Sequence, residues 1–252
     1  MMLGDPGADV IKVELPCGSR SRYQHPLDPL APEGLSRLAF QVFNRNKRGV
    51  VLDLGGQEGR EAFLRMVAGA DFLVENDRPG AMAACGLGFA DLTRVNAGPV
   101  YVATSPFGQD GPYAQPVATD ITLAAMGGMM ALNGDGDRPP ARVSVPQCWY
   151  HAAAESAVGA IVAHQRRLVT GEGQFVDVSV QASVFWTGLN AMIAHSIQGA
   201  DIERNGSQLQ LGTITLPVVY QCADGEVVLL ANAASMPKVV PWMVQEGVVP
   251  AS

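Results

Sequence analysis

Short apolar stretches alternate with amphipathic segments along most of the chain. The stretches that have the composition of strands are residues 8–14, 49–54, 71–75, 100–103 and 175–180. The segments expected to form helices are residues 57–68, 81–85, 90–95, 148–168 and 181–198. Apolar strands that are separated by helices pair in parallel through right-handed crossovers. The pattern therefore predicts an α/β fold with an open, Rossmann-like, doubly wound parallel sheet.

The last part of the chain has a different pattern. Residues 218–222 and 226–230 are two strand-like segments that flank the turn Ala223-Asp224-Gly225, which predicts a hairpin. A helix is expected over residues 237–246. The middle of the chain, between Phe107 and Asp137, is rich in Gly and predicts loops in which the backbone can approach a ligand closely.

Composition narrows the class of protein. The chain has 252 residues, of which 48% are hydrophobic, and a formal net charge of −7. A chain of this size buries a full core, and its acidic balance disfavours nonspecific binding to nucleic acid. No apolar run reaches the roughly 18 residues that a membrane span needs. We therefore expect a cytoplasmic globular protein without a nucleic-acid or membrane partner.

The cysteines and the acidic loops do not predict a metal site. The four cysteines lie far apart in the sequence, without the Cys-x-x-Cys spacing of zinc or redox centres. Asn133, Asp135 and Asp137 have the opening spacing of a calcium loop, but Arg138 and Ser144 stand where Gly and Glu are required. We interpret that segment as a solvated turn and the cysteines as isolated thiols.

Two groups of polar residues suggest chemistry, each with a structural alternative. Arg45, Lys47 and Arg48 form a basic cluster before the second strand, suited either to an anion such as a phosphate or to a solvated loop. His151 and Glu155 lie one helical turn apart. They are either an acid–base or metal pair, or partners in a local hydrogen bond near the start of a helix.

A series of motifs along the chain points to one family. These motifs are Gly7–Glu14, Asn44–Leu54, Glu58-Gly59, Ala70–Asn76, Arg78-Pro79-Gly80, Gly86-Leu87-Gly88, Phe107-Gly108-Gln109, Gly111-Pro112-Tyr113 and Thr170–Ser179. In order and spacing the sequence resembles the family III coenzyme A transferases (the CaiB/BaiF type), which include formyl-CoA transferase, carnitine CoA-transferase and α-methylacyl-CoA racemase.

The resemblance implies a domain organisation and an oligomeric state. Family members begin with a further strand and helix before the Gly-Ala-Asp motif and continue through a smaller α+β domain. On that basis residues 1–198 are expected to form the large CoA-binding domain without its first strand and helix. Residues 199–252 are expected to be the truncated start of the smaller domain. The family fold also implies an interlocked homodimer.

The resemblance further implies a substrate class and a covalent mechanism. An aspartate carboxylate attacks an acyl-CoA thioester, and CoA is then passed to a carboxylic acid, so CoA is a substrate and no cofactor is permanently bound. In this sequence Trp149 stands at the place of that aspartate. Glu155 is the nearest acid on the same helix and is our candidate catalytic residue, with a helix-face carboxylate as the alternative.

The same resemblance assigns CoA contacts. The adenosine and phosphate groups are expected near two segments, Leu52-Asp53-Leu54 and Asn76-Asp77-Arg78. Four cations are available for the phosphates, namely Arg45, Lys47, Arg48 and Arg78. Asp120 fits the acidic position near the CoA site. It follows Thr119 rather than the His of the racemase branch, which disfavours racemisation.

We therefore predict a CoA-transferase that acts on an acyl-CoA and a carboxylic acid. The alternatives are a CoA-thioester isomerase or racemase, and a catalytically inactive CoA-binding dimerisation partner. The inactive partner is an alternative because Trp149 stands at the place of the nucleophilic aspartate.

Overall fold

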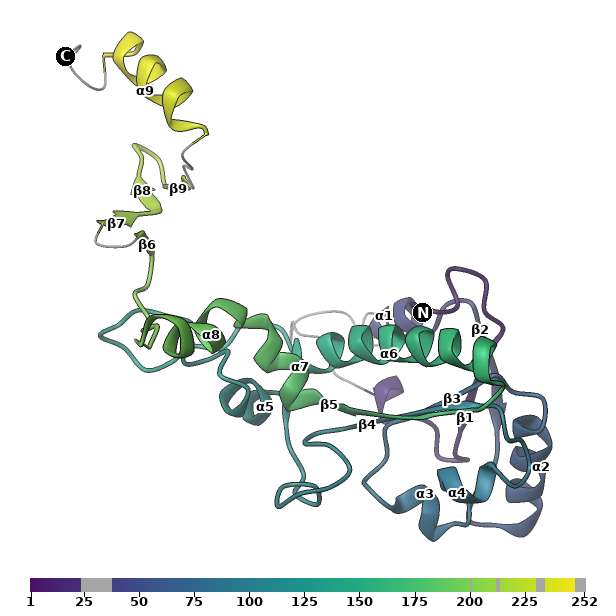
Figure 1. Cartoon of the computed structure of the whole chain (residues 1–252). Coiled ribbons are helices and arrows are strands. Elements are labelled where there is room, and N and C mark those ends of the chain that lie inside the picture. The colour runs from purple at the N-terminus through teal and green to yellow at the C-terminus, as the bar shows by residue number, and fades with distance from the viewer. Residues whose placement is uncertain (24–37, 200, 212–213, 230–233, 248–252) are drawn as a thin grey trace. The chain divides into compact units, whose positions relative to one another are not determined.

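The computed structural model describes residues 1–23, 38–199, 201–211, 214–229 and 234–247. The chain divides into two compact units (Figure 1). The first comprises Met1–Ala131 and Arg142–Ile202, and the second comprises Leu132–Ala141 and Glu203–Ser252. Each unit is described separately below.

The first unit is built on parallel strands. Strands β1 (Val10–Glu14) and β2 (Lys47–Val51) form one parallel pair, and β3 (Phe72–Glu75), β4 (Val100–Ser105) and β5 (Phe175–Ser179) form a parallel sheet in that order. The prediction of an α/β fold with parallel strands is confirmed. Although the two sheets are separate, side chains of both contribute to one apolar cluster, which includes Val13, Leu73 and Tyr101.

Helices cover the sheets on both faces. In chain order the described helices of the first unit are η1 (Arg20–Tyr23), α1 (Leu38–Asn44), α2 (Gln57–Val67), α3 (Ala81–Ala84), α4 (Phe89–Leu92), α5 (Asp120–Met126), α6 (Cys148–Thr170), α7 (Val180–Thr187) and α8 (Leu189–Gln198). Helices α2, α3 and α4 lie against one face of the three-stranded sheet, and α6 lies against the other (Figure 1). None of the described helices is long and apolar enough to cross a bilayer.

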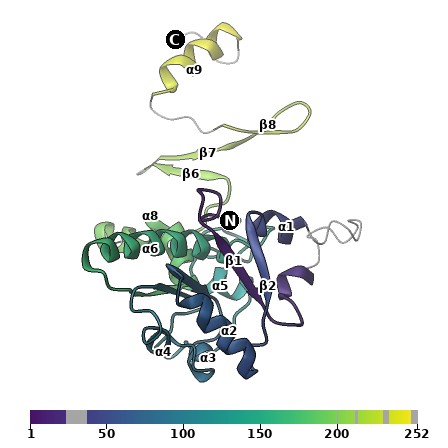
Figure 2. The ribbon, with the colours of Figure 1, turned by 90° about the vertical axis from the view of Figure 1, so that its right-hand side faces the viewer.

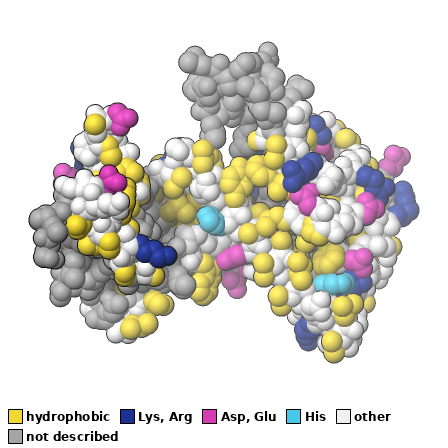
Figure 3. Space-filling model, turned by 90° about the horizontal axis from the view of Figure 1, so that it is seen from above, with side chains coloured by type: hydrophobic (Ala, Val, Ile, Leu, Met, Phe, Trp, Pro, Cys, Tyr) yellow, Lys and Arg dark blue, Asp and Glu magenta, His cyan; other side chains and the backbone are white. Residues whose placement is uncertain are grey.

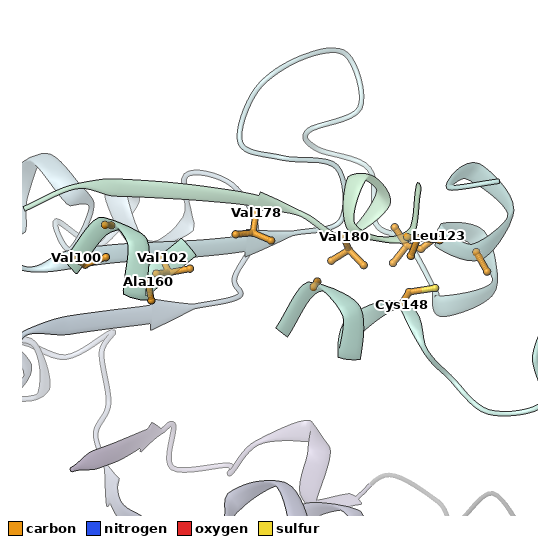
Figure 4. Close-up of a cluster of buried hydrophobic side chains, with 11 residues drawn as sticks. Val100, Val102, Leu123, Cys148, Ala160, Val178 and Val180 are labelled. Carbon is orange, nitrogen blue, oxygen red and sulfur yellow. The ribbon is translucent and has the colours of Figure 1, made fainter. Parts of the chain in front are cut away.

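Two apolar clusters hold these layers together, one on each face of β4. The cluster under α6 contains alternate side chains of β4 and β5 together with small residues of α6 (Figure 4). Its members Ala152, Ala160 and Ala163 let the helix approach the sheet. Gly159 has the same role, because a Cβ atom there would lie 2.9 Å from the Val176 side chain. Burial of both faces explains why β4 is buried along its whole length.

The second unit contains two antiparallel hairpins and a helix (Figure 2). Strands β6 (Gln208–Leu211) and β7 (Ile214–Pro217) pair with each other, as do β8 (Val219–Gln221) and β9 (Glu226–Val228), and α9 spans Met236–Gln245. The hairpin and helix predicted near the end of the chain are thus confirmed. The loop 132–141 belongs to this unit because Arg204 donates hydrogen bonds to the backbone oxygens of Asp135 and Arg138, at 3.0 and 2.9 Å.

Three local predictions differ from the structure. The helix predicted over residues 181–198 is divided into α7 and α8 at Gly188. The strand predicted over residues 49–54 spans Lys47–Val51 instead, so Lys47 and Arg48 of the basic cluster lie in β2 and not before it. Beyond Val51 the Asp53 carboxylate accepts the Gly55 N–H at 3.0 Å, where the chain turns. Helix α5 lies in the Gly-rich middle, where only loops were expected; Thr119 caps it by accepting the N–H of Thr122.

Candidate functional site

The segment 52–54 immediately follows the carboxyl end of β2. Leu52 and Leu54 pack against the apolar cluster beneath α2, whereas Asp53 is exposed and caps the turn at Gly55. The two leucines therefore hold the backbone of this turn in place. In open α/β proteins ligands bind at the carboxyl ends of the strands, which is where this predicted CoA segment lies.

Helix α2 begins against the same turn. A Cβ atom on Gly59 would lie 2.0 Å from the backbone oxygen of Asp53, so only glycine allows this close approach. Gly59 thereby fixes the position of the 52–54 backbone.

The second predicted CoA segment, residues 76–78, follows the carboxyl end of β3. Asn76, Asp77 and Arg78 are all exposed. The Asp77 N–H donates to Glu75 Oε2 at 2.6 Å, and Gly80 adopts a φ of +84° that lets the chain enter α3. The structure thus presents both predicted CoA segments at strand ends, with exposed polar side chains.

A carboxylate that sequence reasoning did not select lies beside this segment. Glu75 is half-buried, and burial raises its pKa to about 7, an effect to which the charges of Asp77 and Asp177 add. Glu75 and Asp177 both pair in register with Ala103, so they flank β4 on one face of the sheet. The strand order that brings them together is a property of the fold; the separate sequence motifs contain no signal for it.

Asp177 also anchors the Phe107-Gly108-Gln109 loop. Its Oδ2 atom accepts the N–H of Gln109 at 2.9 Å, and Gly108 adopts a φ of +92° at that point. The hydroxyl of Ser105, at the end of β4, is buried and has no hydrogen-bond partner among the described residues. The carboxyl end of β4 therefore combines two carboxylates with an unpaired hydroxyl.

The predicted basic cluster is paired with acids of the segment that precedes β1. Arg45 binds Asp5 with an Nη2–Oδ2 distance of 2.7 Å, and Arg48 binds Asp9 through two hydrogen bonds of 2.5 and 3.0 Å. Lys47 donates to Asn44 at 3.0 Å, and burial lowers the pKa of its ammonium. A phosphate would therefore have to share or displace carboxylates to reach the two guanidinium groups.

Asp120 is the first residue of α5 and contacts the first residue of α6. Its Oδ1 accepts the N–H of Cys148, the first residue of α6, at 3.0 Å, and Arg142 lies 4.0 Å from its Oδ2. Trp149, which follows Cys148 in α6, is half-buried and packs against the apolar cluster under α6. The position at which the resemblance places a nucleophile is thus filled by an apolar side chain that packs against the core.

Glu155 lies further along α6 and faces α7. Its Oε2 accepts a 2.6 Å hydrogen bond from the buried hydroxyl of Ser183. On the next position of the helix, Ser156 forms a 2.8 Å hydrogen bond with Thr104 of β4. Within the described residues Glu155 is therefore hydrogen-bonded to Ser183 and not to His151, so the local hydrogen bond predicted between His151 and Glu155 is not formed. No group of three or more His, Cys, Asp and Glu residues in the described part of the chain can hold a metal ion.

Comparisons with known proteins agree with this architecture. The model of CoA-transferase family III matches residues 1–247. The chain is 36% identical to succinyl-CoA:(R)-benzylsuccinate CoA-transferase subunit BbsE of Thauera aromatica, over 98% of this chain and 60% of that protein. It is 34% identical to succinyl-CoA–D-citramalate CoA-transferase of Chloroflexus aurantiacus, over 92% of this chain and 57% of that protein.

A solved structure shows the same fold. A CaiB/BaiF family protein from Brucella suis superposes with a TM-score of 0.81 and 30% sequence identity, covering 96% of this chain and 64% of that one. The chain thus spans about six-tenths of the length of the relatives that it matches.

Proposed function

Because the chain belongs to CoA-transferase family III, we propose that the protein moves CoA from an acyl-CoA thioester to a carboxylic acid. The observation that carries this proposal is identity of 34–36% along at least 92% of the chain to relatives named as CoA-transferases. Those names do not favour the isomerase or racemase alternative, nor that of an inactive partner.

The overall exchange is balanced without an oxidant or a nucleotide. The C–S bond of the donor thioester breaks, and the donor acyl group leaves as a carboxylate. A new C–S bond joins the CoA sulfur to the carboxyl carbon of the acceptor, whose displaced oxygen ends in the donor acid. CoA thioester and carboxylic acid are accordingly substrates, with no permanently bound cofactor required by the stoichiometry.

We place the nucleotide end of CoA at the two strand-end segments, Leu52–Leu54 and Asn76–Arg78. Exposed backbone and polar side chains at the ends of β2 and β3 support this placement. Arg45 and Arg48 lie at the amino end of β2, the opposite end of that strand from Leu52–Leu54, so they bind a phosphate only if CoA extends along the strand. An exposed guanidinium that binds a carboxylate through two hydrogen bonds can bind a phosphate in the same way. Lys47 would contribute a third cation.

We propose Glu155 as the carboxylate that takes part in the exchange. Its hydrogen bond from Ser183 fixes the orientation of the side chain. Trp149, which has no nucleophilic group, leaves Glu155 as the nearest acid on α6.

The test is CoA exchange followed by mass spectrometry. The purified protein is given a panel of acyl-CoAs with isotope-labelled carboxylic acids, and labelled thioesters are identified. Label in a new thioester supports the proposal and names donor and acceptor together; no exchange with any pair contradicts it. If Glu155→Gln exchanges at the wild-type rate, Glu155 is not the nucleophile, and a partner chain becomes the place to seek one, since the Thauera relative is named as a subunit.

We further propose that the protein forms a homodimer. Helix α6 exposes a row of large apolar side chains that are each at least 50% exposed, namely Val158, Ile161, Val162, Leu168 and Val169. Figure 3 looks onto this side of the first unit and shows hydrophobic side chains gathered there. Apolar surfaces of this kind usually mark interfaces. Sedimentation equilibrium gives the mass of the assembly, and a monomer at micromolar concentration would contradict the proposal.

We also propose a cytoplasmic location. Cys17, Cys85 and Cys222 are exposed and free in the described part of the chain, as expected for a reducing compartment. Cell fractionation tests this, and recovery outside the cytoplasm would contradict it.

A further inference from the structure

Helix α6 does not provide its own N-terminal cap. Gln147 stands at the N-cap position and makes no side-chain hydrogen bond to the first turn, and that turn contains no acidic residue. A helix of 23 residues carries partial positive charge at this end and several N–H groups without intrahelical partners. An acceptor for these N–H groups therefore comes from water or from another element of the fold.

Asp120 of α5 supplies that acceptor. Its Oδ1 accepts the Cys148 N–H at 3.0 Å, and its backbone oxygen accepts a hydrogen bond from Cys148 Sγ at 3.3 Å. The Cys148 side chain is fully buried, so the contact closes the core cluster at this end of the helix.

The surroundings of Asp120 fit a structural anchor better than an exposed ligand contact. The Asp120 side chain is only 16% exposed, and Arg142 lies 4.0 Å from the oxygen that does not bind Cys148. Burial, together with the charge of Asp120, raises the pKa of the Cys148 thiol to about 12. The thiol therefore remains a neutral donor at physiological pH.

We propose that Asp120 is a positioning residue that caps α6 and thereby fixes its first turn, including Trp149, instead of contacting CoA. The relevance of this turn to catalysis rests on the proposed function, because the turn begins the helix that carries Glu155, the carboxylate proposed for the exchange. The cap itself is independent of that assignment.

The test compares three variants by hydrogen exchange of the amides of residues 148–152 in the full chain. Asp120→Ala removes the acceptor, and exchange is expected to be about fivefold faster, the change that corresponds to loss of a typical helix cap. Asp120→Asn keeps an acceptor oxygen and is expected to remain within about twofold of wild type. Asp110→Ala removes an exposed carboxylate elsewhere and is the matched control.

A second measurement separates capping from ligand binding. Calorimetric titration with CoA should give the same Kd for Asp120→Asn as for wild type, and the KM for acyl-CoA should be unchanged. Loss of CoA affinity in Asp120→Asn with unaltered exchange of α6 would overturn the proposal, as would equal exchange in wild type and Asp120→Ala.

Two further outcomes are distinguishable. If Asp120→Ala does not fold, Asp120→Ser provides the comparison, because the serine hydroxyl can cap the helix but carries no charge. Rapid hydrogen exchange of α6 in both Asp120→Asn and Asp120→Ser contradicts capping. A wild-type protein without CoA exchange would refute the proposed function while leaving the hydrogen-exchange result valid.

Discussion

The half-buried Glu75 makes a quantitative prediction about stability. The pKa of this carboxyl is raised from 4.5 to about 7, chiefly by burial, with the charges of Asp77 and Asp177 adding to it. In the unfolded chain the carboxyl loses its proton near its ordinary pKa. Between pH 4.5 and about pH 7 the native state therefore holds more protons than the unfolded state.

The sign of the effect follows from that difference. Where the native state binds more protons, the free energy of unfolding falls as pH rises. The full shift corresponds to about 3 kcal/mol, but the carboxyl is partly exposed and water screens its interactions, so we expect about 1–2 kcal/mol. This stability is present below about pH 4.5, is lost as pH rises through about 7, and stays lost above it.

Replacing Glu75 by Gln should remove this pH dependence. The amide keeps an oxygen that can accept the Asp77 N–H but never acquires a charge. Urea unfolding should therefore find the variant about 1–2 kcal/mol more stable than wild type at pH 8, and of nearly equal stability at pH 5.

A matched control is Glu172→Gln, which neutralises an exposed carboxylate on the loop before β5. The difference in free energy of unfolding between Glu172→Gln and wild type should be the same at pH 5 and at pH 8. An equal effect of Glu75→Gln at pH 5 and pH 8, or a variant less stable than wild type at pH 8, would refute the argument from burial.

Three other substitutions test the site and its support. Gly59→Ala brings a Cβ atom against the backbone oxygen of Asp53 and should lower the free energy of unfolding by about 1–3 kcal/mol in urea; wild-type stability would refute the close approach. Arg48→Gln should weaken calorimetric binding of CoA about tenfold without affecting pantetheine, which lacks the nucleotide phosphates; equal losses for both ligands would place Arg48 elsewhere. Thr104→Val breaks the buried hydrogen bond to Ser156 and should lower the free energy of unfolding, measured by thermal unfolding, by about 1 kcal/mol. The control Thr122→Val removes a hydroxyl from an exposed hydrogen bond and should lower the free energy of unfolding by less.

Local sequence patterns were sufficient for most of the secondary structure of the first unit. Apolar runs separated by helical segments predicted β1, β3, β4 and β5 nearly to their ends, since period and turn residues are local properties. The motif series also predicted the family, which the match over residues 1–247 confirms.

The same patterns failed where one or two residues, such as a glycine or a turn-forming aspartate, interrupted a longer apolar or helical pattern. Gly188 divides the helix predicted over residues 181–198, and the Asp53 turn ends β2 early. Helix α5 was missed because the flanking Gly residues indicated loops more strongly than its seven residues indicated a helix.

The partners of the candidate site residues were decided by tertiary structure. Parallel register sets Glu75 and Asp177 on either side of β4, and helix packing gives Glu155 the hydroxyl of Ser183. Asp120 meets the start of α6 across 28 residues of sequence. Sequence by itself determined most elements of the first unit, the family and the residue types available for chemistry. Which of those residues meet depended on burial and strand order, because hydrogen bonds and pKa shifts arise between groups that only the folded chain brings together.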